Sequence, residues 1–223
     1  MRFLALLLAS AAFVGCSAMN VEIPSEVKTS GKKADIKWSK SLTKQDPLVF
    51  APFKTTALDI DWESGSSSGF SVAGIGGGSK SSEQGYTFTL SKEGSKDVVA
   101  VECKKTGSQS GMSIGGLNMG DAKADLNCKF ANGGVLNSPV GPDGSMTGVV
   151  NGLKSGEITY SPIFMDDAGK ASKTPLGYSL SVGGKAIGVL NLGKDKSYWF
   201  VGQNDALDLD AAATAVSLFF FYQ

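Results

Sequence analysis

The stretch Asp205-Ala-Leu-Asp-Leu-Asp-Ala-Ala-Ala-Thr-Ala-Val-Ser-Leu-Phe-Phe-Phe-Tyr222 decides the expected fold, because it breaks the pattern of the rest of the chain. Its alanines favour an α-helix, and the acidic residues before them suit a helix N-terminus. From Ala211 to Tyr222 no residue is charged, so the helix would be apolar on every face and must be enclosed on all sides. It is too short to cross a bilayer. We therefore expect a buried helix over residues 206–222.

The residues before this stretch form short runs in which apolar and polar side chains alternate, separated by turn residues. Such alternation is typical of half-buried β-strands. Tyr86-Thr-Phe-Thr-Leu90 and Val98-Val-Ala-Val101 flank a turn that carries Gly94, and this arrangement predicts a β-hairpin. Val182-Gly-Gly-Lys185 predicts a second tight turn. We expect about ten strands in a mainly β, antiparallel barrel or sandwich that forms one domain over residues 34–223.

Three arrangements of these strands are compatible with the sequence, and they differ in the position and structure of the C-terminal segment. Ala211–Tyr222 would measure about 20 Å as a helix, roughly the depth of a small barrel, which favours a helix inside a barrel. Alternatively, the helix packs on one face of an ordinary β-sandwich. In a third arrangement, Val216–Phe221 forms a final strand, like the closing strand of an outer-membrane barrel. Three consecutive Phe residues spoil the alternation that such a strand needs.

Several motifs near the C-terminus suggest a family. They are Gly177-Tyr-Ser-Leu, Gly184-Lys-Ala-Ile-Gly-Val, Ser197-Tyr-Trp-Phe and the acid-led helix from Asp208. This part of the chain resembles the tubby-like architecture shared by tubby, phospholipid scramblase and plant LURP-one proteins. The resemblance implies a barrel of strands around a central helix. The family's barrel meets phosphoinositides or membranes, but no basic lipid-binding patch is visible here, so that activity is not carried over.

The N-terminus has the layout of a secretory signal peptide, with Arg2, an apolar run over residues 3–15 and then Cys16. Phe13-Val-Gly-Cys16 resembles the lipobox of bacterial lipoproteins, although Leu is usual where Phe13 stands. The resemblance implies that residues 1–15 are removed and that Cys16 carries the lipid. The alternative is an ordinary cleaved signal peptide with an incidental Cys16. Ser17 resembles an outer-membrane rather than an inner-membrane sorting signal.

Residues 16–33 are polar and lack periodicity, so we interpret them as a tether between membrane and domain. Two cysteines remain in the expected domain. Cys103 and Cys128 lie in strand-like runs joined by a glycine-rich segment, and an exported protein meets an oxidising compartment. We expect a disulfide between them, with two separate buried thiols as the alternative.

The composition excludes several classes of function. The 21 Lys and Arg residues balance the 21 Asp and Glu residues, so we expect no nucleic-acid partner. The chain has no His, which excludes Ser-His-Asp catalysis, the usual zinc sites and an imidazole base for a thiol. We expect no cofactor and no metal, and we interpret the protein as a non-enzyme. Acidic residues in three groups are read as helix caps and solvated turns rather than as calcium ligands: Asp59, Asp61, Asp166, Asp167, Asp205, Asp208 and Asp210.

Two glycine-rich segments, residues 64–85 and 107–121, are interpreted as loops. The second carries apolar residues that would be exposed on a loop: Met112, Ile114, Leu117 and Met119. We expect these side chains to fold back onto the domain. The alternative is that they dip into lipid or touch a partner.

The expected function is therefore that of a lipid-anchored protein of the bacterial cell envelope with a binding or structural role. Its partners would be the membrane, through Cys16, and an unidentified protein or glycan. One alternative is a lipid- or lipoprotein-handling protein, which needs an open apolar cavity. Another is a surface adhesin or carbohydrate-binding module that uses exposed Trp38, Trp62 or Tyr86.

Overall fold

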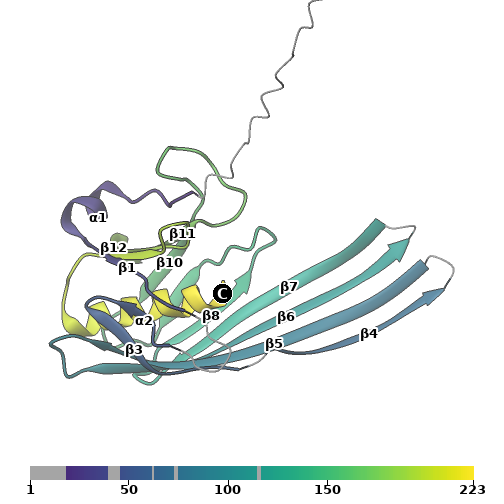
Figure 1. Ribbon diagram of the computed structural model, residues 1–223, viewed down its shortest axis with the longest axis horizontal. Helices are drawn as coiled ribbons and strands as arrows, with labels where there is room; N and C mark the ends of the chain where they lie inside the picture. Colours follow the sequence, from purple (N-terminus) through teal and green to yellow (C-terminus); the bar gives the residue numbers. More distant parts are fainter. Residues whose placement is uncertain (1–18, 40–45, 62, 73–74, 115–116) are drawn as a thin grey trace, which may run out of the picture.

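The computed structural model describes residues 19–39, 46–61, 63–72, 75–114 and 117–223 (Figure 1). Across these residues the chain forms mainly β-strands, with a short helix near the start and a long one at the end. The elements in chain order are α1 (Ser25–Ser30), β1 (Lys32–Asp35), β2 (Val49–Phe50), β3 (Phe53–Ile60), β4 (Ser64–Val72), β5 (Ile75–Lys92), β6 (Val98–Ile114), β7 (Leu117–Phe130), β8 (Val135–Val140), β9 (Gly148–Asn151), β10 (Ile158–Ile163), β11 (Gly177–Val182), β12 (Lys185–Asn191), β13 (Ser197–Phe200) and α2 (Asp205–Phe221).

The strands form one antiparallel sheet that curls into a barrel. Its order is β1-β13-β12-β11-β10-β9-β8-β7-β6-β5-β3-β2, and β4 pairs with β5 outside this path. The two ends of the sheet meet where Lys37 and Val49 exchange backbone N–H···O bonds of 2.8 and 3.0 Å. The barrel is confirmed, and the sandwich is not the arrangement observed.

Local turn chemistry explains why consecutive strands lie side by side. Gly183 and Gly184 join β11 to β12, and their φ angles are 58° and 81°. A two-residue hairpin turn of this kind needs positive φ at both positions, which glycine adopts without steric cost. The tight turn predicted from Val182-Gly-Gly-Lys185 is therefore confirmed.

Helix α2 lies inside the barrel and is buried along almost its whole length (Figure 1). It contacts β5 and β6 on one side and β11, β12 and β13 on the other. Asn204 caps its N-terminus by accepting a 3.0 Å hydrogen bond from the backbone N–H of Leu207. The predicted range, 206–222, agrees with the observed helix to within one residue at each end.

The hydroxyl groups within α2 are satisfied by the helix itself. Thr214 Oγ1 donates to the Asp210 carbonyl at 2.8 Å, and Ser217 Oγ donates to the Ala213 carbonyl at 2.9 Å. Each bond reaches back one turn, so the two buried hydroxyls need no partner on the barrel wall. Ser and Thr therefore fit an enclosed helix without the cost of an unpaired polar group.

The barrel wall holds α2 by polar contacts near its C-terminus. Tyr86 Oη donates a 2.6 Å hydrogen bond to the Ser217 carbonyl, and burial raises the pKa of this tyrosine. Lys105 Nζ donates to the Phe221 carbonyl at 2.9 Å and lies 4.8 Å from the centre of the Phe221 ring. A cation at this position also interacts favourably with the helix dipole.

The segment expected to be a tether is packed against the outside of the barrel. Val21 and Val27 are buried with Ala186 and Val189 in a small second core, and α1 contacts β12 and β13. The tether interpretation of residues 16–33 is therefore wrong for the part of this segment that the structure describes. Val21 and Val27 stand too far apart in the chain for a periodicity to be visible, so sequence alone gave no sign of this core.

Phe219→Ala is expected to lower the free energy of unfolding by about 4 kcal/mol, because it opens a cavity where α2 meets the barrel wall. Phe219 is 1% exposed and its ring packs against Trp38 with 6.1 Å between ring centroids. Val98→Ala is the control, since Val98 is 61% exposed and its truncation should leave stability almost unchanged. Urea unfolding followed by circular dichroism measures both variants, and equal losses would contradict an enclosed helix.

Candidate functional site: the projecting arm

Strands β5, β6 and β7 continue beyond the barrel and, with β4 paired to β5, form a curved sheet that projects from it (Figure 1). We call residues 64–85 and 104–123 the arm. The pairing of β3 with β5 ends at Tyr86 and the pairing of β7 with β8 ends at Ala124, so the arm is bounded by β4 on one edge and β7 on the other. The arm is the most prominent feature outside the compact barrel, and we treat it as the candidate functional site.

Where the structure describes residues 64–85 and 107–121, they form strands, so the interpretation of these parts as loops is wrong. β5 and β6 remain in one uninterrupted antiparallel register from Ser91↔Val98 to Ile75↔Ile114. Glycine and serine favour turns and are poor strand formers, which is why the sequence predicted loops. The strands begin inside the barrel, where Phe88 and Val101 are buried, and the hydrogen-bonded ladder carries the same register outward.

A disulfide joins β6 to β7 where the arm leaves the barrel. Cys103 and Cys128 are directly opposite each other, with 4.1 Å between their Cα atoms, and both are buried. The predicted disulfide is confirmed. The covalent link therefore joins the two strands at the base of the arm.

The sheet of the arm has two faces, which we name by their relation to the barrel interior. We call inner the face that carries Tyr86 and Cys103, because both are buried in the barrel interior, and outer the opposite face. On the outer face hydroxyl groups pair across β4 and β5: Ser66 with Ser81 at 2.9 Å and Ser68 with Ser79 at 3.0 Å. An exposed ion pair, Lys104–Glu83 at 2.7 Å, lies nearer the barrel.

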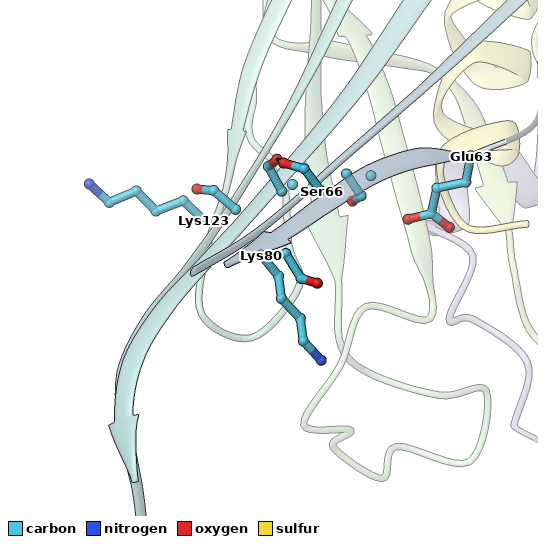
Figure 2. A pocket seen from close by; sticks show the side chains of 10 residues that line it. Glu63, Ser66, Lys80 and Lys123 are labelled. Atoms are coloured by element: carbon cyan, nitrogen blue, oxygen red, sulfur yellow. Dashed lines mark hydrogen bonds between the residues drawn. The ribbon is translucent and has the colours of Figure 1, made fainter. Parts of the chain in front are cut away.

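Two shallow hollows of about 520 and 500 Å³ lie on the arm, and both are rich in hydroxyl groups and exposed backbone. Figure 2 shows the first hollow, where the side chains of Lys80 and Lys123 project away from the strands in different directions. The surface can donate and accept hydrogen bonds, and its ammonium groups can attract an anionic ligand. The chain has no His that could act as a base for these serines.

The acidic residues at the start of α2 have structural partners. Lys92 Nζ lies 2.7 Å from both Asp205 Oδ1 and Asp208 Oδ2. Partial burial lowers the pKa of Lys92, but hydrogen bonds and the negative charges of Asp205 and Asp208 outweigh this and hold the pKa above its usual value. The interpretation of these acids as groups that stabilise the helix N-terminus agrees with this arrangement.

Asp210, two residues after Asp208 in α2, is also buried. It accepts hydrogen bonds from Asn132 Nδ2, at 2.6 Å, and from Ser155 Oγ. Burial raises the pKa of Asp210, and the two hydrogen bonds partly offset that rise. In the described part of the chain, no group of three or more His, Cys, Asp or Glu residues is placed to hold a metal ion.

The aromatic residues suggested for glycan binding do not form an exposed platform. Tyr86 is buried inside the barrel, so the expectation of an exposed Tyr86 is wrong. Trp38 is half-buried, and its ring centroid lies 5.4 Å from that of Phe220 on α2. Trp62 lies outside the described residues, as does Cys16. Asp166 accepts N–H bonds from Ala168 and Lys170 within its own turn.

Helix α2 packs closely against the barrel wall near the middle of the helix. The gap next to Phe50, Tyr198 and Val216 leaves no room for a water molecule. The helix therefore occupies the volume in which a barrel would otherwise hold a ligand. Over the described residues, no helix is long and apolar enough to span a membrane.

Comparisons with models of protein families, with curated proteins and with solved structures found no match to this chain. The observations that bear on function are therefore those made on its own residues.

Removing the disulfide with Cys103→Ala/Cys128→Ala is expected to lower the free energy of unfolding by about 3 kcal/mol. The cross-link closes a loop with a sequence separation of 25 and so restricts the unfolded chain. Amides of the arm should also exchange with deuterium faster than those of the barrel. A reducing agent is the control, since it should destabilise the natural chain and leave the variant unchanged; equal sensitivity of both would contradict this role.

Lys92→Met is expected to lower the free energy of unfolding by about 2 kcal/mol at pH 7, because it leaves the buried Asp208 carboxylate without its cation. The folded pKa of Lys92 lies above 10.5, so its contribution is complete below pH 10.5 and is lost as the pH rises through the folded pKa. The difference between variant and natural chain should therefore shrink at alkaline pH. Lys96→Met, at an exposed position, is the control. If the difference in free energy of unfolding between Lys92→Met and the natural chain stayed the same at all pH values, the lost stability would come from packing and not from the ion pair.

Proposed function

We propose that this protein is a lipid-anchored protein of the bacterial cell envelope, and that its barrel is a non-catalytic scaffold which presents the arm for binding. The observation that carries the proposal is the position of Cys16 directly after the apolar run over residues 3–15. Two or three acyl chains on this residue would hold the protein on a membrane durably. Ser17 favours the outer membrane over the inner membrane.

The Cys103–Cys128 disulfide supports an exported protein. Disulfides persist in the periplasm and on cell surfaces, where thiols are not kept reduced. The link lies at the base of the arm, so an oxidising compartment would keep the arm in its extended form. The balanced charge of the chain also argues against nucleic acid as a partner.

With a lipid on Cys16, the packed N-terminal segment would keep the barrel close to the membrane. Met19 is three residues after Cys16, a span of at most about 11 Å, and burial begins at Val21. A lipid on Cys16 would thus hold the barrel at the bilayer surface. The arm would then be the part that reaches away from the anchor to a protein, a glycan or the membrane itself.

Neither alternative function is favoured by a specific observation. A lipid-handling protein needs an apolar cavity, and α2 fills the interior that could have provided one. A carbohydrate-binding module needs exposed aromatic rings, whereas Tyr86 is buried and Trp38 packs on α2. We therefore retain the anchored scaffold as the proposed function.

Mass spectrometry of protein purified from bacterial membranes tests the anchor. The expected mature N-terminus is Cys16, with a diacylglyceryl group on its sulfur. Cys16→Ser should move the protein from the membrane fraction to the soluble fraction, and it leaves every described residue unchanged. An unmodified Cys16 thiol, or a mature N-terminus elsewhere, would overturn the proposal.

A further inference from the structure

One long edge of the arm has no partner strand in the described part of the chain. β4 pairs with β5 from Ser64 to Val72, and among the described residues no strand pairs with it on its other side (Figure 1). The backbone N–H and C=O groups on that side therefore lack the ladder that β5 and β6 have on both of their sides. An unpaired edge of this kind is a template for a further strand.

The residues of β4 that face the free edge follow from a hydrogen bond at the base of the arm. The Asp61 N–H donates to the Gly85 carbonyl at 2.9 Å, so Gly85 directs its backbone groups toward the side of β5 on which β4 lies. Successive residues of an antiparallel strand direct these groups to alternate sides, so Ser81 also faces β4, and its partner Ser66 faces β5. The residues of β4 between such positions direct their backbone groups to the free edge: Gly65, Ser67, Gly69 and Ser71.

Strand β4 lacks the features that usually protect an edge strand. It contains no proline and no charged residue, and its register with β5 is unbroken over nine residues. Natural edges are usually short, bulged, or interrupted by proline or lysine. The opposite edge of the arm differs, because β7 carries Asp121 and Lys123 in the stretch beyond Ala124, where its pairing with β8 ends. Of the two edges, β4 is therefore the one suited to a further strand.

We propose that β4 pairs antiparallel with β4 of a second copy of this chain, so that two arms form one continuous sheet. We call the line along which the two strands pair the seam. The proposal names the partner of the arm and therefore rests on its proposed role as the binding part of the protein, but it needs no lipid on Cys16. A two-fold axis through Ser68 uses the full length of both strands, since Ser64 then lies opposite Val72 of the second copy.

The hydroxyl groups on the outer face favour a second copy as the partner. Ser66 and Ser68 are exposed, and Ser68 Oγ lies 3.0 Å from Ser79 Oγ across the β4–β5 ladder. The two-fold axis places Ser68 opposite Ser68 of the second copy on the same face, so this row of hydroxyl groups continues across the seam. An unrelated peptide would be selected through pockets for its side chains, whereas residues 64–68 of β4 offer only serine and glycine for such selection.

The antiparallel arrangement also keeps the two barrels apart. β4 runs away from the barrel, with Ser64 at the base of the arm and Val72 at its free end (Figure 1). Because paired antiparallel strands run in opposite directions, the two barrels lie at opposite ends of the joined sheet. The two β4 strands can therefore meet along their whole length without contact between the barrels.

Analytical ultracentrifugation of the full chain with Cys16→Ser tests the pairing without a contribution from acyl chains. The chain should form dimers, and Ser67→Pro should raise the dissociation constant at least about tenfold, because each copy loses a backbone N–H that faces the seam. Ala122→Pro is the matched control on the free edge of β7 and should leave the dissociation constant unchanged. Ser68→Lys keeps every backbone N–H and should also weaken the dimer, since it places two like charges directly opposite each other.

A cysteine placed in β4 tests the register of the seam. Ser68→Cys should form a disulfide between two copies under mild oxidation, because directly opposite residues whose backbone groups face away from each other have Cα atoms about 4.5 Å apart. Cys103 and Cys128 form such a pair within the arm, with 4.1 Å between their Cα atoms. Ser79→Cys is the matched control, since Ser79 lies beside Ser68 but one strand further from the seam, and it should remain monomeric on a non-reducing gel.

A chain that stays monomeric, or a dimer that neither Ser67→Pro nor Ser68→Lys weakens, would overturn the proposal. Cross-linking of Ser79→Cys as readily as Ser68→Cys would also overturn it, and loss of the dimer in Ala122→Pro would identify the edge of β7 instead. The lipid anchor is tested separately by the mass of the Cys16 peptide. Failure of the pairing therefore leaves the anchor standing and removes only the second copy as the partner of the arm.

Discussion

The fold depends on the enclosure of one helix that has no polar face. Between Leu207 and Phe221 every residue of α2 is buried, so water cannot solvate any side of it. The sheet curls around the helix and encloses it. The backbone bridge between Lys37 and Val49 joins the two ends of the sheet. Charged groups are confined to the helix ends, where Lys92 faces the acidic first turn and Lys105 meets the last carbonyls.

Helix α2 occupies the interior of the barrel, and the arm lies outside it. The arm extends the sheet beyond the barrel through one continuous backbone ladder. Cys103 and Cys128 are buried where the arm begins, and their disulfide joins β6 to β7 there.

The sequence alone did not predict most of the candidate site. Glycines such as Gly111 and Gly120 led us to predict loops, because glycine loses much conformational entropy in a strand and has no side chain to pack. The arm is nevertheless a sheet, since its strands start inside the barrel and the ladder extends from there. The expectation that the side chains of Met112 and Leu117 fold back onto the domain concerns side chains outside those that the structure describes; the backbone of both residues is paired within β6 and β7. The packed N-terminal segment was missed because Val21 and Val27 find their partners on β12 and not near each other.

The sequence by itself determined the features that depend on neighbouring residues. These are the enclosed helix, the glycine turn at Gly183 and Gly184, and the pairing of Cys103 with Cys128. Each follows from local preference, periodicity or the number of available cysteines. Only the tertiary structure decided that the described parts of the glycine-rich segments are paired strands that project as an arm. Strand register is set by partners far apart in the chain, and a shift of one residue would have placed every side chain on the other face.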